Sequence, residues 1–253
     1  FKIIEDASHA LGGFYEDGNP IGSCIYSEMT VFSLHPVKGV TAGEGGVITT
    51  NDKELYRALK QLRSHGICKG NFDLPGISIG DDTIINTSEA VEDGKLNPWY
   101  YEMQNLGYNY RITDIQCALA ISQLSKLENF IKRKREIISL YDSFFRDKKT
   151  FKITQKKYRN FSSHHLYVIR INFEELGLSR GRLMNKLFEQ GIGTQVHYIP
   201  IPLHPYYSSK GLKLSNFPVM EKYYREALSI PLYFGLSDVL VDQVCSKILE
   251  FSK

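Results

Sequence analysis

A lysine set in a glycine-rich connection between two apolar runs constrains this chain more than any other feature. The segment reads MTVFSLHPVKGVTAGEGGVITT, and its two apolar ends predict buried strands of an α/β sheet. The connection bends at Pro36 and contains Gly43, Gly45 and Gly46, which allow the backbone to approach a ligand closely. Lys38 lies among apolar neighbours, a setting that favours the neutral amine, the form that adds to carbonyl carbons. Most lysines are exposed residues that increase solubility. The prediction that Lys38 is reactive therefore depends on the surrounding sequence pattern.

The composition excludes several classes of protein. The chain has 31 lysines and arginines against 28 aspartates and glutamates, a formal charge of +3 that is too small for a dedicated nucleic-acid binder. No apolar run is long enough to span a bilayer, and the first residues do not resemble a signal peptide. The four cysteines are widely spaced, which favours neither a disulfide framework nor a metal site. We therefore expect a cytoplasmic protein without metal, membrane or nucleic-acid partners.

The first part of the chain has the pattern of an α/β domain. Short apolar runs, of which Phe1 to Glu5 is the first, alternate with glycine-containing connections and predict buried strands. A helix capped by Asn51 or Asp52 follows the third run. After an irregular stretch, Thr113 caps a second predicted helix, which extends from Asp114 to Lys149 without glycine or proline.

The second part predicts a small α+β domain. The apolar runs HLYVIRIN and TQVHYI are typical of strands, and helices are predicted after Ser179, from Pro218 to Leu228 and after Ser237. Strands and helices in this order form a compact α+β unit. We expect residues 1–130 to belong to a large domain and residues 131–253 to form a small C-terminal domain.

A further pair of polar residues follows the first apolar run. The segment IIEDASHA places Asp6 and His9 just after a predicted strand, where open α/β sheets assemble ligand sites. An isolated aspartate at such a position is more often a helix cap or a turn former than a catalytic carboxylate. The segment that contains Lys38 changes this balance.

The two segments together resemble the signature of a known enzyme family. D-A-S-H-A followed by F-S-x-H-P-x-K-x-x-T-x-G-E-G-G is similar to the DegT/StrS sugar aminotransferases, which have the aspartate aminotransferase fold, fold type I of the pyridoxal-phosphate enzymes. The resemblance implies pyridoxal 5'-phosphate as cofactor, with Lys38 as the lysine that carries it and moves the proton in catalysis. Asp6 would pair with the pyridine nitrogen, Ser33 would bind the phosphate, and His9 would lie against the ring.

Two later segments extend the resemblance. G-x-N-x-R-x-x-D-I-Q-x-A is similar to the family stretch that reaches into the neighbouring subunit, so Asn109 would bind the cofactor phosphate of a homodimer partner and Arg111 would line the substrate or phosphate region. V-H-Y-x-P is similar to a segment that faces the nucleotide-sugar pocket, which makes His197 and Tyr198 substrate-site candidates. Without the resemblance, the first pair would be a loop before a helix and the second an ordinary half-buried sheet segment.

The resemblance also implies a reaction. Family members move an amino group from an amino acid, usually glutamate, to a nucleotide-linked keto sugar. The run from Pro98 to Glu102 is similar to the transaminases that make UDP-4-amino-4,6-dideoxy-N-acetyl-β-L-altrosamine, a precursor of pseudaminic acid. The expected substrate is therefore a UDP-linked 4-keto-6-deoxy-N-acetylhexosamine, which takes the amino group at C4. An insertion from Phe72 to Leu96 is longer than expected, so sugars of the perosamine and 4-amino-arabinose types stay open.

Two other interpretations remain. Family members that dehydrate their substrate have histidine in place of the lysine, and Lys38 argues against that chemistry. A catalytically silent scaffold or regulatory module would keep the fold and lose the chemistry. The chain starts with Phe1 in a predicted strand, and we expect an N-terminal third, with part of the active site, to be missing from it.

Overall fold

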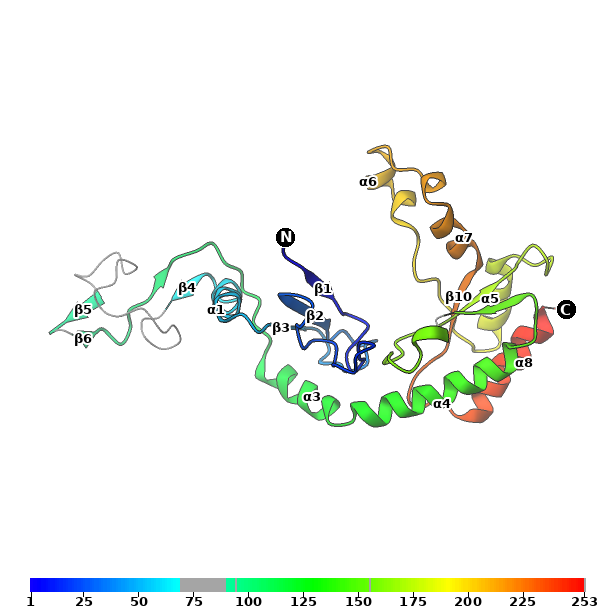
Figure 1. Ribbon diagram of the computed structural model, residues 1–253, viewed down its shortest axis with the longest axis horizontal. Coiled ribbons are helices and arrows are strands. Elements are labelled where there is room, and N and C mark those ends of the chain that lie inside the picture. Colours follow the sequence, from blue (N-terminus) through cyan, green and yellow to red (C-terminus); the bar gives the residue numbers. More distant parts are fainter. Residues whose placement is uncertain (69–89, 94, 155, 253) are drawn as a thin grey trace. The chain divides into compact units, whose positions relative to one another are not determined.

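The computed structural model describes residues 1–68, 90–93, 95–154 and 156–252 (Figure 1). The chain forms two compact units: unit 1 contains Phe1–Ser8 and Pro20–Ser122, and unit 2 contains His9–Asn19 and Gln123–Lys253. The units divide between residues 122 and 123, whereas the expected domain boundary lies between 130 and 131, which stays a prediction about the complete protein. Most of the predicted insertion from Phe72 to Leu96 lies outside the described residues.

Unit 1 is built on a three-stranded sheet with the order β1-β2-β3. β1 (Ile4–Asp6) runs parallel to β2 (Met29–Ser33), and β3 (Gly46–Thr49) runs antiparallel to β2. Thr30 and Phe32 of the central strand are buried. The predicted strands are confirmed, but their predicted burial is wrong for β1 and β3. These are edge strands, and within the described residues their outer sides are largely uncovered.

Local signals fix the helices of unit 1. α1 (Lys53–Leu62) begins after Asp52, whose carboxylate accepts hydrogen bonds from the backbone N–H groups of the first turn at 2.8 and 3.1 Å. α3 (Asp114–Leu124) begins after Thr113, whose Oγ1 accepts the N–H of Gln116 at 3.3 Å. Both predicted caps are confirmed. Two short antiparallel ribbons complete the described part of this unit: β4 (Ile67–Cys68) with β7 (Glu102–Met103), and β5 (Val91–Glu92) with β6 (Lys95–Leu96).

The single long helix predicted from Asp114 to Lys149 is wrong. The structure has two helices, α3 and α4 (Leu127–Phe145), with a break at Ser125 and Lys126. The backbone N–H of Lys126 donates to the carbonyl of Gln123 at 3.0 Å, a tighter turn than an α-helix makes. No glycine or proline marks the break, so the sequence pattern did not reveal it.

Unit 2 packs three helices on an antiparallel sheet. β9 (Tyr167–Ile171) lies between β8 (Phe151–Ile153) and β10 (Ala227–Ile230). α4, α5 (Arg180–Glu189) and α8 (Asp238–Phe251) bury their apolar faces in one core with this sheet. The core includes the fully buried side chains Ile137, Tyr141, Phe145, Ile169, Ile171, Leu183, Leu187, Leu228, Val241 and Ile248. The predicted combination of strands and helices is present in this unit, and Ser179 and Ser237 cap α5 and α8 as predicted.

The segment between α5 and β10 differs from its prediction. TQVHYI does not form a strand, and only Gln195 makes an isolated bridge, to Ser229. Two prolines follow at once, and proline lacks the N–H that a strand ladder needs. Short helical turns η2 (Ile201–Leu203), α6 (Pro205–Ser208) and η3 (Leu214–Asn216) lead instead into α7 (Pro218–Glu226). In the part of the chain that the structure describes, no helix is both long and apolar enough to cross a bilayer.

Candidate active site

Two polar side chains lie at the same edge of the unit 1 sheet. Asp6 is the last residue of β1 and Ser33 the last residue of β2, and these strands are parallel neighbours. One carboxylate oxygen of Asp6 accepts the backbone N–H of Ser8 at 3.0 Å and its hydroxyl at 2.5 Å. Carboxyl ends of parallel strands are where open sheets bind ligands. The sheet therefore brings a carboxylate and a hydroxyl to a position suited to a ligand.

Lys38 lies in a loop of residues 34–45, here called the lysine loop, which connects β2 to β3. The loop is closed at its base, where the N–H of Leu34 donates to Gly45 O and the N–H of Ala42 donates to Leu34 O, both at 2.9 Å. The N–H of Lys38 donates to His35 O at 2.9 Å and forms a tight turn. Lys38 is half-buried, and its amine makes no hydrogen bond or ion pair within the described residues. A closed backbone frame thus holds a lysine whose amine is available to react.

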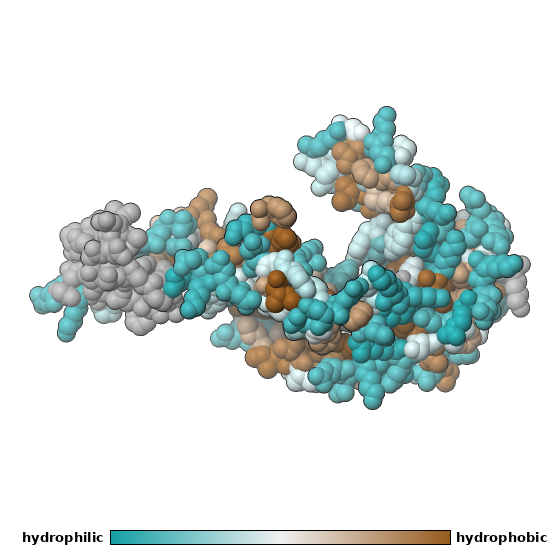
Figure 2. Space-filling model, viewed as in Figure 1, coloured by the Kyte–Doolittle hydropathy of each residue, from teal (hydrophilic) through white to brown (hydrophobic). Residues whose placement is uncertain are grey.

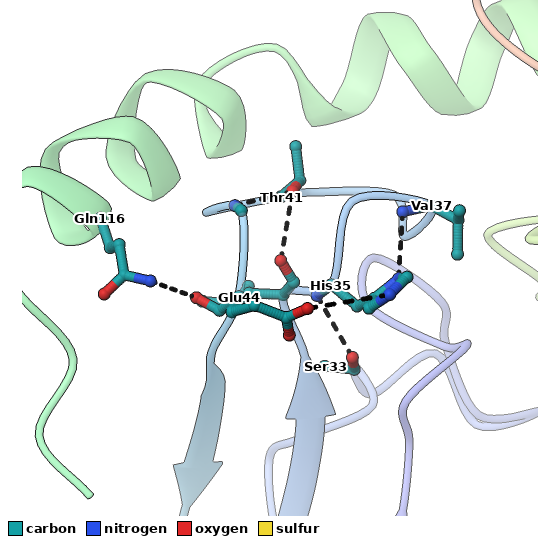
Figure 3. A network of polar contacts seen from close by, with 8 residues as sticks. Ser33, His35, Val37, Thr41, Glu44 and Gln116 are labelled. Carbon is teal, nitrogen blue, oxygen red and sulfur yellow. Dashed lines mark hydrogen bonds and ion pairs between the residues drawn. The ribbon is translucent and has the colours of Figure 1, made fainter.

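A polar network orders the turn before Lys38 (Figure 3). Ser33 Oγ accepts the N–H of His35 at 3.3 Å, and His35 Nδ1 accepts the N–H of Val37 at 3.4 Å. The other ring nitrogen, Nε2, lies 3.9 Å from the Glu44 carboxylate across the loop. Because Nδ1 accepts a hydrogen bond, this geometry assigns the ring proton to Nε2, on the side of Glu44. The hydroxyl hydrogen of Ser33 stays available for a ligand oxygen.

Asn109 and Arg111 lie on an extended segment of unit 1. The backbone of this segment is held at the end of α1, since the N–H of Tyr108 donates to Leu62 O at 2.7 Å and the N–H of Tyr110 donates to Arg63 O at 2.9 Å. The side chains of Asn109 and Arg111 are exposed. Within the described residues no hydrogen bond or ion pair joins either of them to the lysine loop, so both face solvent from a fixed backbone.

His9 belongs to unit 2, although Asp6 lies only three residues before it. The rings of His9 and His165 have centroids 4.1 Å apart, and Ser163 Oγ donates to the His9 carbonyl at 3.4 Å. His164, which lies between Ser163 and His165 in the sequence, is buried and has a backbone φ of 56°. Burial, and secondarily the positive charges of nearby arginines, lower the pKa of His164 to about 4.

His197 and Tyr198 lie on the segment that faces β10. His197 Nδ1 is 2.8 Å from the hydroxyl of the buried Ser229, so the ring is fixed against that strand. The Tyr198 ring stands perpendicular to it, with centroids 4.7 Å apart, and is largely exposed. The pair thus consists of one fixed imidazole and one aromatic ring that faces solvent.

Sequence reasoning did not single out four residues that take part in these arrangements. They are His35, Glu44, Gln116 and His165. His35 and Glu44 lie inside the segment that was recognised, and Gln116 follows Thr113 at the spacing of a capping box. For His165 the only signal was a pair of histidines before a predicted strand, which by itself indicates no function.

Comparison with known proteins is consistent over nearly the whole chain. A model of the DegT/DnrJ/EryC1/StrS aminotransferase family matches residues 1–249. The UDP-4-amino-4,6-dideoxy-N-acetyl-β-L-altrosamine transaminase of Campylobacter jejuni is 36% identical over 233 residues, which are 91% of this chain and 53% of that protein. The structure of Helicobacter pylori PseC, an aminotransferase involved in the biosynthesis of pseudoaminic acid, has a TM-score of 0.79 and 28% identity, and the match covers 99% of this chain and 59% of PseC.

A sugar aminotransferase from Streptococcus pneumoniae, described as putative and solved in its PMP form, gives a TM-score of 0.81 at 29% identity over 100% of this chain and 59% of that structure. This chain thus spans a little over half the length of the relatives it matches. These structures confirm the predicted α/β fold, that of the family's pyridoxal-phosphate aminotransferases. Because the family model matches all but the last four residues, the chain belongs to the DegT/DnrJ/EryC1/StrS aminotransferase family.

Proposed function

We propose that this protein is a pyridoxal 5'-phosphate-dependent aminotransferase for nucleotide sugars. It would move an amino group from an amino acid, with glutamate as the proposed donor, to C4 of a UDP-linked 4-keto-6-deoxy-N-acetylhexosamine. One observation carries the proposal: Asp6 and Ser33 end two parallel neighbouring strands, and Lys38 lies in the loop that follows the second. A carboxylate, a hydroxyl and a primary amine are the groups that this cofactor needs.

The residues present fit the cofactor. Ser33 Oγ accepts a backbone N–H and keeps its own hydrogen for a phosphate oxygen. Asp6 keeps one carboxylate oxygen fixed by Ser8, so the group can hold a proton on a ring nitrogen. Bound pyridoxal phosphate supplies the carbonyl group that takes up the amine and a ring that accepts electrons. Lys38 would hold it and then move a proton as general base and general acid.

The remaining candidates would complete the site. We assign His9 to the face of the cofactor ring, and His197 and Tyr198 to the nucleotide sugar, where one fixed imidazole and one exposed aromatic ring suit a polar ligand with a planar base. Asn109 and Arg111 would serve the phosphate and substrate of the neighbouring subunit. Each of these assignments follows the family motif at that position.

A homodimer agrees with the surface around Asn109 and Arg111. Apolar side chains are exposed on both sides of them, including Leu106, Ile115 at 84% and Ile121 at 70%. Figure 2 shows brown apolar surface over α3. An apolar surface of this kind beside exposed functional side chains is typical of a protein interface. We therefore propose a two-fold homodimer with shared active sites.

The substrate class is supported by the relatives. One relative at 36% identity is a transaminase named for a UDP-4-amino-4,6-dideoxy-N-acetyl sugar, and PseC belongs to the biosynthesis of pseudoaminic acid. The exposed rings of Trp99 and Tyr101 lie in the run that suggested this sub-family. Four cysteines without disulfides agree with a reducing cytoplasm, where we place the reaction.

Borohydride reduction tests this proposal directly. The protein is mixed with pyridoxal phosphate, its visible absorption is recorded before and after reduction, and peptide masses locate the label. We expect the label on Lys38, its loss in Lys38→Arg, and its retention in the control Lys53→Arg, which changes a lysine of α1. Absence of the label, both from this chain and from a version extended to the length of its relatives, would favour the silent scaffold. Assays with glutamate and keto sugars of the UDP-N-acetyl, perosamine and 4-amino-arabinose types then identify the substrate.

A further inference from the structure

The side chain of Gln116 connects two segments that the sequence motifs treat separately. Its Nε2 donates to the carbonyl of Glu44, in the lysine loop, at 3.0 Å. Its Oε1 accepts the N–H of Thr113 at 3.1 Å and the hydroxyl of Thr113 at 3.0 Å. Figure 3 shows Gln116 reaching from α3 to Glu44 at the end of the loop. One amide group thus bridges 72 residues of sequence.

An amide group performs both tasks, because its oxygen accepts hydrogen bonds and its nitrogen donates them. Thr113 offers donors and Glu44 offers a carbonyl acceptor, so the bridging group must accept at one end and donate at the other. A carboxylate in this position would accept from Thr113, as in the common capping box, but would have no hydrogen for the Glu44 carbonyl. The hydrogen-bond pattern therefore explains glutamine here beyond its role in starting α3.

A second contact joins the same two segments. Gly45 has a φ of 139°, and a Cβ added to it would lie 2.9 Å from Ile112 Cδ1. The side chain of Ile112 thus packs directly on the loop backbone, one residue after the carbonyl that Gln116 binds. The contact of Ile112 and the hydrogen bond of Gln116 thus hold adjacent residues of the loop. The loop also closes at this point, where the N–H of Leu34 donates to the carbonyl of Gly45.

We propose that Gln116 is a positioning residue that couples the lysine loop to residues 109–113. The consequence for catalysis rests on the proposed function. Lys38 would act in the site of its own subunit, whereas Asn109 and Arg111 would complete the site of the partner. Gln116 then links the backbone that holds the lysine of one site to the backbone that presents the phosphate and substrate contacts of the other.

Two variants separate coupling from capping. Gln116→Glu keeps the acceptor for Thr113 and removes the donor for Glu44, whereas Thr113→Val removes the cap and leaves the bond to Glu44. Backbone hydrogen exchange is measured on the protein without cofactor or substrate. We expect Gln116→Glu to speed exchange in residues 34–45 about five-fold, the effect of one lost hydrogen bond, with residues 109–113 unchanged. Thr113→Val should act mainly on residues 109–117. As a control, Gln123→Leu changes a glutamine of α3 whose side chain makes no hydrogen bond within the described residues.

The outcomes are separable. Unchanged exchange of the lysine loop in Gln116→Glu would overturn the proposal, and so would equal loosening of that loop by Thr113→Val, which would reduce Gln116 to a helix cap. In the active enzyme we expect Gln116→Glu to lower kcat about three- to ten-fold with little change in KM for the sugar. Because the exchange measurement needs no cofactor, failure of Lys38 labelling would refute the proposed function and leave the coupling itself standing.

Discussion

The two three-stranded sheets of this protein differ in how they are covered. In unit 2, β9 and β10 are almost entirely buried, and Ile169 at the centre is 0% exposed. In the β1-β2-β3 sheet of unit 1, only β2 has buried side chains, and Ile48 of β3 is 44% exposed. The sheet of unit 2 is covered by α4, α5 and α8, so its buried side chains stabilise the unit. Within the described residues, the sheet that bears Asp6 and Ser33 is only partly covered.

This difference indicates that the residues proposed to react and the residues that stabilise the fold lie in different units. The candidate catalytic groups lie at strand ends and in the lysine loop of unit 1, where hydrogen bonds rather than a large core set the geometry. Functional loops are commonly drawn from the less stable parts of a fold. Substitutions of the candidate catalytic groups in unit 1 should therefore act mainly on activity, and substitutions in the core of unit 2 mainly on stability.

The largest effect on activity is expected for Lys38→Arg. The guanidinium cannot bind the cofactor covalently or move a proton at neutral pH, so the rate should fall by about 10²- to 10⁴-fold or more. Transaminase activity and thermal unfolding are measured together. Because the lysine is only half-buried, the melting temperature should stay close to that of the unchanged protein. If the variant lost activity only because it unfolded, the proposed division between residues for activity and residues for stability would be contradicted.

The next effect is on stability and compares one substitution in the two sheets. Ile169→Ala leaves a cavity at the centre of the unit 2 core and should lower the free energy of unfolding by about 2–5 kcal/mol. Ile48→Ala at the partly exposed strand β3 should cost less than half as much, because less apolar surface returns to water. Urea unfolding followed by circular dichroism measures both. Equal losses would mean that β3 is as well covered as β9 in solution.

The sequence predicted the elements whose signals are local. Asp52, Ser179 and Ser237 cap helices by bonding to backbone groups two or three residues away, so their type and spacing were sufficient. The predicted helix from Pro218 to Leu228 includes the first two residues of β10 (Ala227–Ile230), because only the pairing with β9 makes this segment a strand. The break between α3 and α4 carried no glycine or proline and was missed.

The site divides in the same way. Asp6, Ser33 and Lys38 could be placed at strand ends and in a loop, because an apolar run followed by a turn shows where a strand stops. Their chemical roles came from the resemblance and stay predictions. The grouping of His9 with unit 2 and the bridge made by Gln116 depend on contacts between segments far apart in the chain, which periodicity does not encode.

Glycine positions in the lysine loop give a third, smaller effect. Gly45→Ala combines a φ of 139° with a Cβ 2.9 Å from Ile112, and we expect a loss of about 1–3 kcal/mol in the free energy of unfolding together with weaker cofactor binding. Gly43→Ala has a φ of 82° and meets nothing within 4 Å, so it carries the backbone strain alone. Cofactor titration and urea unfolding compare the two variants. If both lose equally, the contact with Ile112 does not fix the loop.

The last prediction uses pH to test how tightly the interior of unit 2 is packed. His164 is buried, and its pKa is lowered from 6.5 to about 4, so the folded protein resists a proton that the unfolded chain accepts. The contribution of His164 to the free energy of unfolding is complete above pH 6.5. It falls as the pH drops from 6.5 to 4 and changes no further below pH 4. The loss should reach about 2 kcal/mol, after allowance for solvent screening.

His164→Asn tolerates the left-handed backbone and cannot take up this proton, so its unfolding free energy should fall less between pH 7 and pH 4.5 than that of the unchanged protein. Identical pH slopes in urea unfolding of the two proteins would show that the interior of unit 2 admits the charge and is less tightly closed than its buried side chains indicate.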